Sequence, residues 1–411
     1  MLIKRLQYGA TKCYKLHCGK SSVVCPDLKV DTWKLVNPSM SPSSILELVD
    51  QEGDPHTLET VPFTKYLGDF SSADGKNDKN IEERFNKGNG KVSEIFFLLE
   101  DLCLGKYFFE SGNILRNSLL LSSLLSNSES WYNVTPNQVE KLERVDEYML
   151  RKMLYSHSKV AKELLYLETG NIPCRFVLMA RRLNFLWYML HLDRETLLRS
   201  FLQAQIDQPS VGDWITTVLQ DIETLNLNIN LEGVVVISKT RFKKKVKQAI
   251  TDKAFEYLVS QQATHSKSKP LKYSKLKLQP YLQADGVDLT IKEKAFIFEA
   301  RSRMIDIRDN FKTGKSDLRC RACNVEVEDQ PHLLQCTKLT ENGEIVQEIP
   351  KYSDLFGEDP AKIAAVSRIL QRKFTLLKSF NNQSAPTTVS VTYTSTSNGS
   401  ASTLLQQSGL G

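Results

Sequence analysis

The pattern of apolar and polar positions divides the chain into two parts. Short stretches of alternation over residues 13–18 and 28–35, separated and followed by prolines, are typical of strands and loops. The run 61–72 is predicted to be a strand that leads to a turn at residues 74–75. From about residue 78 the apolar spacing becomes helical. The pattern therefore predicts a small β part followed by a mostly helical body.

The clearest predicted helix begins at Thr135. Pro136 suits its first position and Gln138 completes a capping box with Thr135. Its expected apolar stripe is Val139, Leu142, Val145, Met149 and Met153. The remaining helices are predicted over residues 78–100, 108–126, 175–191, 195–207, 211–226, 239–263, 290–310 and 359–379.

The predicted helix at 175–191 combines two kinds of face. Phe176, Leu183 and Leu186 belong to an apolar face that should meet the core, with Trp187 beside them. Arg181 and Arg182, together with the arginine that opens the helix, are expected on a wet face. They are candidates for contacts with nucleic-acid phosphates, or equally an ordinary exposed helix face.

Composition is that of a globular protein with two or three domains: 411 residues, 41% hydrophobic and 25% charged. No apolar run reaches the length of a membrane span, so no membrane partner is expected. The cysteines show no disulfide framework and no signal peptide is apparent. A reducing compartment, nucleus or cytoplasm, is therefore expected. Residues 381–411 contain no charge and few apolar groups, so this tail is predicted to be disordered.

Candidate chemistry is concentrated near the C-terminal end. Cys320, Cys323, His332 and Cys336 follow the spacing C-x2-C-x8-H-x3-C. Two thiols two residues apart, followed by a His and a Cys on one helical turn, give the closed ligand set of a structural zinc site. The adjacent Arg319 and Arg321 are candidates for phosphate contacts. The alternative is four unrelated residues in a reduced protein.

Positive charge is concentrated in one block. Between residues 239 and 281 there are twelve Lys or Arg and two acids, so the block carries +10 while the rest of the chain carries −4 of the overall +6. Such a block attracts polyanions by counterion release. Lys243, Lys244 and Lys245 are the strongest candidates for phosphate contacts, and the same run suits a nuclear import signal. The alternative is a solvated helix face followed by a basic linker.

Several short motifs, taken in order, resemble a known family. They are Y-G-A-T-K-C at residues 8–13, K-Y-L-G at 65–68 with D-G-K at 74–76, and helical segments at 130–132, 143–146, 150–154 and 181–186, followed by the Cys3His module. Together they resemble the later part of the reverse transcriptases of non-LTR (LINE-type) retrotransposons. The resemblance covers about residues 5–380, and its order is more specific than any single motif.

The resemblance implies an α+β fold that is mostly α-helical. It assigns an incomplete polymerase palm to residues 1–77, a helical thumb to 78–235, a basic nucleic-acid-binding segment to 236–315, the zinc knuckle to 316–340 and a last helix to 341–380. Lys12 would lie near the incoming nucleotide, or be an ordinary strand lysine. Tyr66, Leu67 and Gly68 would form the primer grip, or a plain β-turn.

One element of the family is absent from this sequence. Its polymerase chemistry requires an adjacent aspartate pair, written Y/F-x-D-D, that holds Mg²⁺, and the chain contains no Asp-Asp dipeptide. We therefore expect a reverse-transcriptase fragment without polymerase activity, with no catalytic residue of its own, and Mg²⁺ only in an intact parent. The zinc would be structural.

Three functions remain open on the sequence alone. The first is the reverse-transcriptase fragment, which would bind RNA and DNA, as a primer–template hybrid or as element RNA, and no small-molecule substrate. The second is a non-enzymatic, element-derived protein that binds nucleic acid with the help of zinc. The third is a helical interaction scaffold with an incidental zinc site. Salt-sensitive binding of nucleic acid separates the first two from the third.

Overall fold

The fold is known from a computed structural model that describes most of the chain. The described residues are 45–49, 55–59, 63–66, 69–72, 77–102, 105–311, 317–340 and 350–383. This part of the chain is mostly helical, with few strands, as the sequence predicts. The expected strands at 13–18 and 28–35, the turn at 74–75 and nearly all of the tail from 381 lie outside the described residues.

The strands form two separate antiparallel hairpins. Strand β1 (Ile45–Val49) pairs with β2 (Pro55–Glu59), and β3 (Phe63–Tyr66) pairs with β4 (Asp69–Ser72). The prediction of one strand over 61–72 is therefore wrong. Tyr66 pairs with Asp69, so the chain reverses within that run, and two-residue connections are common between antiparallel strands.

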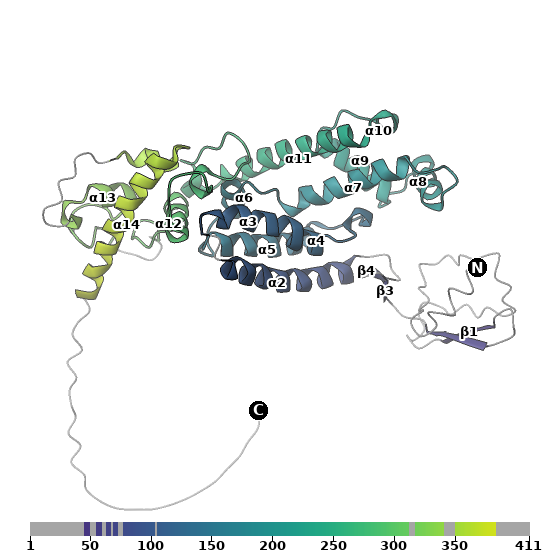
Figure 1. Cartoon of the computed structure of the whole chain (residues 1–411), viewed down its shortest axis with the longest axis horizontal. Helices are drawn as coiled ribbons and strands as arrows, with labels where there is room; N and C mark the ends of the chain where they lie inside the picture. The colour runs from purple at the N-terminus through teal and green to yellow at the C-terminus, as the bar shows by residue number, and fades with distance from the viewer. Residues whose placement is uncertain are drawn as a thin grey trace, which may run out of the picture.

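The helices run in order through the body of the molecule (Figure 1). They are α2 (Asp78–Asp101), α3 (Phe108–Leu115), α4 (Leu121–Leu124), α5 (Pro136–Met153), α6 (Lys162–Thr169), α7 (Cys174–Leu190), α8 (Leu197–Asp207), α9 (Trp214–Thr224), α10 (Leu231–Val236), α11 (Lys239–Gln262), α12 (Ile291–Arg301), α13 (Gln330–Gln335) and α14 (Pro360–Gln383). Helices α7 and α11 lie side by side, with α8–α10 at one end of the body and α12–α14 at the other.

Local signals explain where several helices begin. Thr135 accepts a hydrogen bond from the Gln138 backbone while the Gln138 side chain returns one to Thr135, so the predicted capping box is confirmed. Asp359 caps α14 by accepting from the backbone N–H groups of Ala361 and Lys362. That helix extends to Gln383, four residues beyond the predicted end.

Two predicted helices differ from those observed. Residues 108–126 form α3 and α4 separated by a π-helical turn, Arg116–Leu120, instead of one helix. The 290–310 helix ends at Arg301, because Arg303 adopts a left-handed backbone (φ 54°) and Met304 N–H donates to the Glu299 carbonyl at 2.8 Å. Helices α6 and α10, both short, were not predicted.

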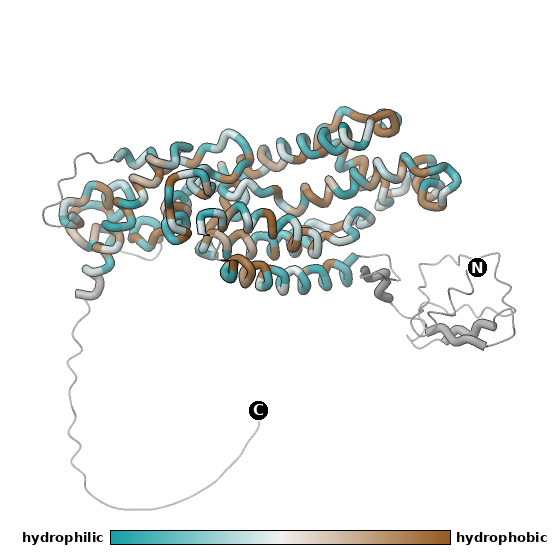
Figure 2. Tube along the Cα trace, in the orientation of Figure 1, coloured by the Kyte–Doolittle hydropathy of each residue, from teal (hydrophilic) through white to brown (hydrophobic). Residues whose placement is uncertain are grey.

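Apolar residues recur along the helices (Figure 2). Their buried side chains form two clusters. The larger cluster extends from α2 to α14, and the smaller is built by α7, α8, α9, α10 and α11. The predicted stripe of α5 is confirmed in four of its positions, while Val139 is half-buried. Gly88 lies against the Val145 side chain, where an added Cβ would come within 2.9 Å of its methyl carbon, so close packing of α2 on α5 requires glycine there.

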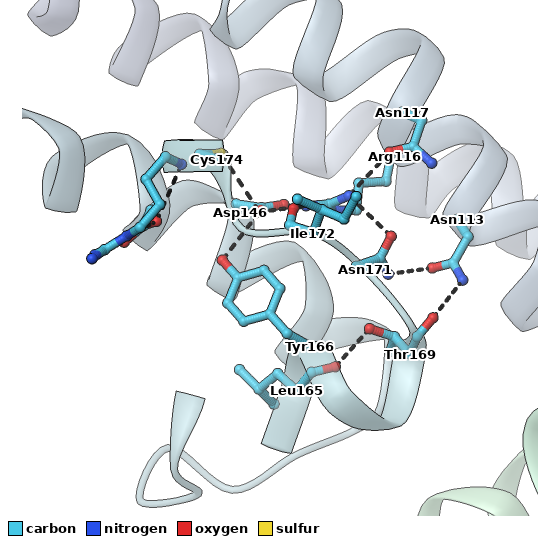
Figure 3. Close-up of polar contacts among 12 residues, drawn as sticks. Asn113, Arg116, Asn117, Asp146, Leu165, Tyr166, Thr169, Asn171, Ile172 and Cys174 are labelled. Carbon is cyan, nitrogen blue, oxygen red and sulfur yellow. Dashed lines mark hydrogen bonds and ion pairs between the residues drawn. The ribbon is translucent and has the colours of Figure 1, made fainter. Parts of the chain in front are cut away.

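A charged network is buried among α3, α5, α6 and α7 (Figure 3). Arg116 donates to both carboxylate oxygens of Asp146, at 2.6 and 2.5 Å, and a third donor contacts Asn171 at 2.9 Å. The Tyr166 hydroxyl also donates to Asp146. Burial opposes the charge on Arg116, but the Asp146 carboxylate outweighs it and raises the pKa of the guanidinium. The π-helical turn begins at this arginine.

A second buried network joins the bundle to the C-terminal helices. Glu168 at the end of α6 accepts from Arg301 at 3.0 Å and from the hydroxyls of Tyr273 and Tyr281. Burial, followed by the Glu168 charge, raises the pKa of both tyrosines, so they stay protonated donors. The α12–α14 region is therefore attached to the bundle through the interior.

Candidate metal centre and basic helix

The first two candidate ligands lie on a tight loop. Arg319 and Val327 form an isolated antiparallel bridge that closes its base. Within the loop, Cys320 N–H donates to the Glu326 carbonyl at 2.6 Å and Asn324 N–H donates to the Cys320 carbonyl at 2.7 Å. Asn324 adopts a left-handed backbone (φ 58°), which asparagine tolerates better than most residues. The loop brings the two thiols of the CxxC onto one side.

Helix α13 and the residue that follows it supply the other two candidate ligands, His332 and Cys336. Asp329 caps this helix by accepting from His332 N–H at 2.7 Å. Cys336 N–H donates to the His332 carbonyl at 2.7 Å, so the two ligands are one helical turn apart. All four ligand atoms lie within 4.8 Å of one another, and Cys323 Sγ is 3.4 Å from His332 Nε2. The structure thus gathers the four residues that the spacing singles out into a cluster that can hold a metal ion.

The donor set fits a zinc ion. Bond lengths of 2.0–2.3 Å place the ligand atoms of tetrahedral zinc about 3.5–3.8 Å apart, so only a small contraction of the cluster is needed. Burial raises the pKa of the Cys336 thiol to about 11 and raises that of Cys320. Burial opposes ionisation of Cys323 too, but hydrogen bonds from the Glu326 and Val325 backbone outweigh it and lower the pKa of this thiol to about 7. A bound metal would favour all three thiolates.

Two residues that sequence reasoning missed contact the ligands from outside the cluster. The Glu326 carboxylate lies 2.9 Å from His332 Nδ1, an arrangement that orients Nε2 toward the sulfurs. Lys373 of α14 donates to the carbonyls of Leu334 and Cys336, at 2.8 and 3.1 Å, and is buried. The signal for Glu326 is an acid between the second and third ligands, whereas nothing in the sequence indicates Lys373.

The ligand cluster is part of a larger folded unit. Cys320, Cys336 and Leu333 belong to the same buried cluster as Leu370 of α14 and Phe298 of α12. The Tyr352 hydroxyl donates to Gln330 of α13 as well. Metal at this site would therefore stabilise the packing of α12, α13 and α14 together, and not just a short loop.

The two arginines beside the CxxC have different environments. Arg321 donates to both carboxylate oxygens of the fully buried Glu328, at 2.6 and 2.7 Å. The side chain of Arg319 is 58% exposed and pairs with Asp317, itself 43% exposed. Exposed pairs of this kind contribute little and open easily. Arg321 therefore holds the module together, while Arg319 is available to an external phosphate.

The prediction that the arginines of α7 lie on a solvent-exposed face is wrong. Arg182 is 6% exposed and donates to both carboxylate oxygens of Asp221 in α9, at 2.7 and 2.9 Å. Arg181 donates to the carbonyl of Leu125, just after α4, and to that of Leu121, where α4 begins. The remaining arginine of this face, Arg175, is bound by Glu143. These guanidiniums join helices, which leaves Arg182 with no free face for a phosphate.

Helix α11 has the reverse arrangement. Phe242, Val246, Ile250, Ala254 and Leu258 are buried at intervals of four residues. Lys243, Lys244 and Lys245 are exposed. Lys245 donates to the Asn228 carbonyl at 3.1 Å, and within the described part of the chain no carboxylate pairs with any of these three lysines. This row of consecutive lysines spreads around the solvent side of the helix, so its side chains do not all point the same way.

Other sequence-predicted residues fall partly outside the described structure. Lys12, Leu67 and Gly68 lie outside the described residues, and Tyr66 ends β3. Trp131 is buried as expected of a core residue. Trp187 is half-buried and donates from its ring N–H to the Ile237 carbonyl at 2.9 Å, so it joins α7 to the segment before α11.

Comparison with known proteins assigns no family. No protein-family model matches the chain, and neither does any curated protein or solved structure. In the part of the chain that the structure describes, no helix has both the length and the apolar character to cross a membrane.

Proposed function

We propose that this chain binds RNA or DNA through α11 and that a zinc ion stabilises its C-terminal unit. The observation that carries the proposal is the row of exposed lysines at 243–245, which no described carboxylate neutralises. Each ammonium group that replaces a condensed counterion on a phosphate contributes to affinity. The other candidate arginines, except Arg319, are held by groups of the protein itself, so α11 is the main attachment point.

The metal has a structural part in this proposal. Cys320, Cys323, His332 and Cys336 would fill the four positions of a tetrahedral zinc ion, which leaves none open for a substrate. Zinc would hold the CxxC loop against α13. Lys373 and the surrounding apolar residues would then hold α14 against this unit. The exposed Arg319 next to the loop would add one phosphate contact.

The origin that we propose is the later part of a non-LTR reverse transcriptase. The order of the pieces supports it: a hairpin whose first strand ends in Tyr66, a helical bundle, a basic helix and a Cys3His module. In such a parent this region would hold the primer–template duplex. Without an Asp-Asp pair, the chain itself would bind and not polymerise. In-frame coding sequence upstream that supplies Y/F-x-D-D would support this origin, and its absence would favour the element-derived binding protein.

The test of binding is a salt series with a charge-matched control. Anisotropy of a labelled RNA–DNA hybrid is measured for the wild type, for Lys243→Gln/Lys244→Gln/Lys245→Gln, and for Lys106→Gln/Lys292→Gln/Lys362→Gln, three exposed lysines elsewhere. Loss of three phosphate contacts should lower the slope of log K against log salt by about 2.7. The control should keep the wild-type slope. Equal slopes for all three proteins would refute binding through α11.

The zinc part is tested separately. The purified chain should contain one zinc per molecule, and Cys320→Ser/Cys323→Ser should contain none and lose the cooperative unfolding of the C-terminal unit. The α11 lysines do not depend on the metal, so the double variant should retain most hybrid binding. A metal-free wild type with unchanged thermal stability would remove zinc from the proposal and leave binding by α11 intact.

A further inference from the structure

One flank of α11 forms a wall of a groove. The lysines at 243–245 alone do not indicate this groove. The groove has a volume of about 620 Å³, within the range of small-molecule sites. Its other wall is the turn that follows α9. The lining residues on which the argument depends are Asn226, Arg241, Lys244, Gln248, Asp252 and Glu256.

The turn after α9 is held in place by its own hydrogen bonds. Asn226 adopts a left-handed backbone (φ 49°), and Leu227 N–H donates to the Ile222 carbonyl at 3.0 Å. Lys245 reaches across from α11 to the Asn228 carbonyl, which connects the two walls. The Leu225 and Leu227 side chains are buried in the smaller core, while the Asn226 side chain is exposed at the rim. The groove is therefore formed by the fold of the chain itself and does not need a ligand to form.

The charges along the groove are ordered. Arg241 and Lys244 lie at its N-terminal end, and within the described residues neither has an ionic partner. Further along α11, Gln248 donates to Asp252 at 2.8 Å, and Lys253 pairs with Glu256 at 3.0 Å. One end is thus cationic and uncompensated, whereas the other carries the Lys253–Glu256 ion pair and the Asp252 carboxylate, which accepts only from a neutral amide. An elongated ligand with an anionic head and a neutral polar body would bind in one direction only.

We propose that this groove seats one unpaired nucleotide of a bound single strand. Its phosphate would contact Arg241 and Lys244, and its ribose or base would lie along Gln248 and Asn226, whose amides can donate and accept. The carboxylate of Asp252, which pairs with no cation among the described residues, would repel a second phosphate and so set the register. This rests on the proposed function and adds to it a preference for single-stranded segments, because a base in a duplex is stacked and cannot enter a groove.

The lining also indicates how selective the site is. The apolar part of the lining is small, because Leu225 and Leu227 are buried in the core, and no aromatic ring lines the groove. Single-strand sites usually gain affinity from bases stacked on aromatic side chains. Binding here would therefore depend on the phosphate and on amide hydrogen bonds, with weak discrimination between bases.

The opposite flank of α11 provides a matched control. Lys243 and Lys247 are exposed, one helical turn apart, and do not line the groove. Arg241→Gln/Lys244→Gln and Lys243→Gln/Lys247→Gln remove the same charge from the same helix without touching its buried face. Anisotropy is measured with a labelled ten-nucleotide oligouridylate and with a duplex RNA that carries the same number of phosphates.

The groove pair should weaken oligouridylate binding at least tenfold and lower its salt slope by about 1.4, since each contact on a single strand contributes about 0.7. The flank pair should weaken it threefold or less, and the two variants should have equal effects on the duplex. Ultraviolet crosslinking of an oligomer that contains 4-thiouridine should mark the peptide with Asn226 or that with Gln248.

Two outcomes would overturn the proposal in different ways. If the wild type binds the oligomer and both pairs weaken it equally, binding is spread along the lysine row and the groove holds no nucleotide, while the proposed function stands. If the wild type binds neither the oligomer nor the duplex at low salt, the proposed function fails together with the groove. Circular dichroism of both variants confirms that α11 remains folded.

Discussion

The cations of α7 and those of α11 look alike in the sequence and have opposite positions in the structure. Arg182 is buried against Asp221, and Arg181 caps the end of α4. Lys243 and Lys244 extend into solvent from a helix that buries its apolar side. A cation that is placed by an internal acceptor cannot also neutralise an external polyanion. The number of basic residues in a segment therefore sets an upper limit to phosphate binding, and the internal acceptors decide what remains.

The largest expected effect is on the buried side of this comparison. Arg116→Leu would leave Asp146 charged and unpaired in the interior, and removal of one partner of a buried ion pair costs about 3–5 kcal/mol. Urea denaturation should show this loss in the free energy of unfolding. Arg116→Leu/Asp146→Leu, which removes both charges, should cost less. A single variant with wild-type stability would show that the buried pair of Arg116 and Asp146 does not stabilise the fold.

Arg116→Leu should also distinguish buried from exposed cations in a binding measurement. The folded fraction of Arg116→Leu should bind the RNA–DNA hybrid with the wild-type salt slope, because this arginine is 1% exposed. The triple lysine variant of α11 should show the converse, with a changed slope and nearly unchanged stability. If both variants changed the slope, internal and external cations would not be separable in this protein.

A smaller effect is expected at the metal centre. Glu326→Gln would weaken the hydrogen bond that orients His332, and loss of such an outer partner typically lowers metal affinity 10–100-fold. Competition with a chromogenic chelator should measure the change for zinc. Asp317→Asn is the charge-matched control, since Asp317 pairs with Arg319 and lies apart from the ligands. Equal zinc affinities for both variants would mean that the carboxylate has no part in the site.

The sequence predicts those features that local chemistry determines. The capping box at Thr135 and the grouping of the four candidate ligands depend on residues that are close together in the sequence. The structure contains the capping box and brings the four ligands together. The break of the 108–126 helix does not follow from local pattern, because Arg116 reaches Asp146, thirty residues away. Likewise the Arg182 partner lies in α9, and the groove beside α11 requires the turn at Asn226. Long-range partners are invisible in a single sequence.

The N-cap of α5 tests whether local or long-range contacts fix the start of a helix, and its expected effect is of intermediate size. Thr135→Ala removes the side-chain acceptor at the start of α5, which typically costs about 1 kcal/mol. Thermal or urea unfolding should show that loss, and Thr135→Ser should recover most of it. A cost near that of Arg116→Leu would indicate that Thr135 serves the core as well as the cap. A cost near zero would mean that tertiary packing alone fixes where α5 begins.

The smallest expected effect concerns Arg319, the candidate arginine that is both paired with a carboxylate of the protein and exposed to solvent. Arg319 pairs with Asp317, yet its side chain is 58% exposed. Arg319→Gln should change stability by at most about 0.5 kcal/mol, as is usual for an exposed pair. It should lower the hybrid salt slope by about 0.9 if the arginine contacts a phosphate. Arg321→Gln, next to the same thiol, should do the reverse: destabilise the module through the uncompensated Glu328 and leave the slope unchanged. Matching slopes for the wild type and Arg319→Gln would confine nucleic-acid binding to α11, because no other sequence-predicted arginine in the described residues is both exposed and weakly held.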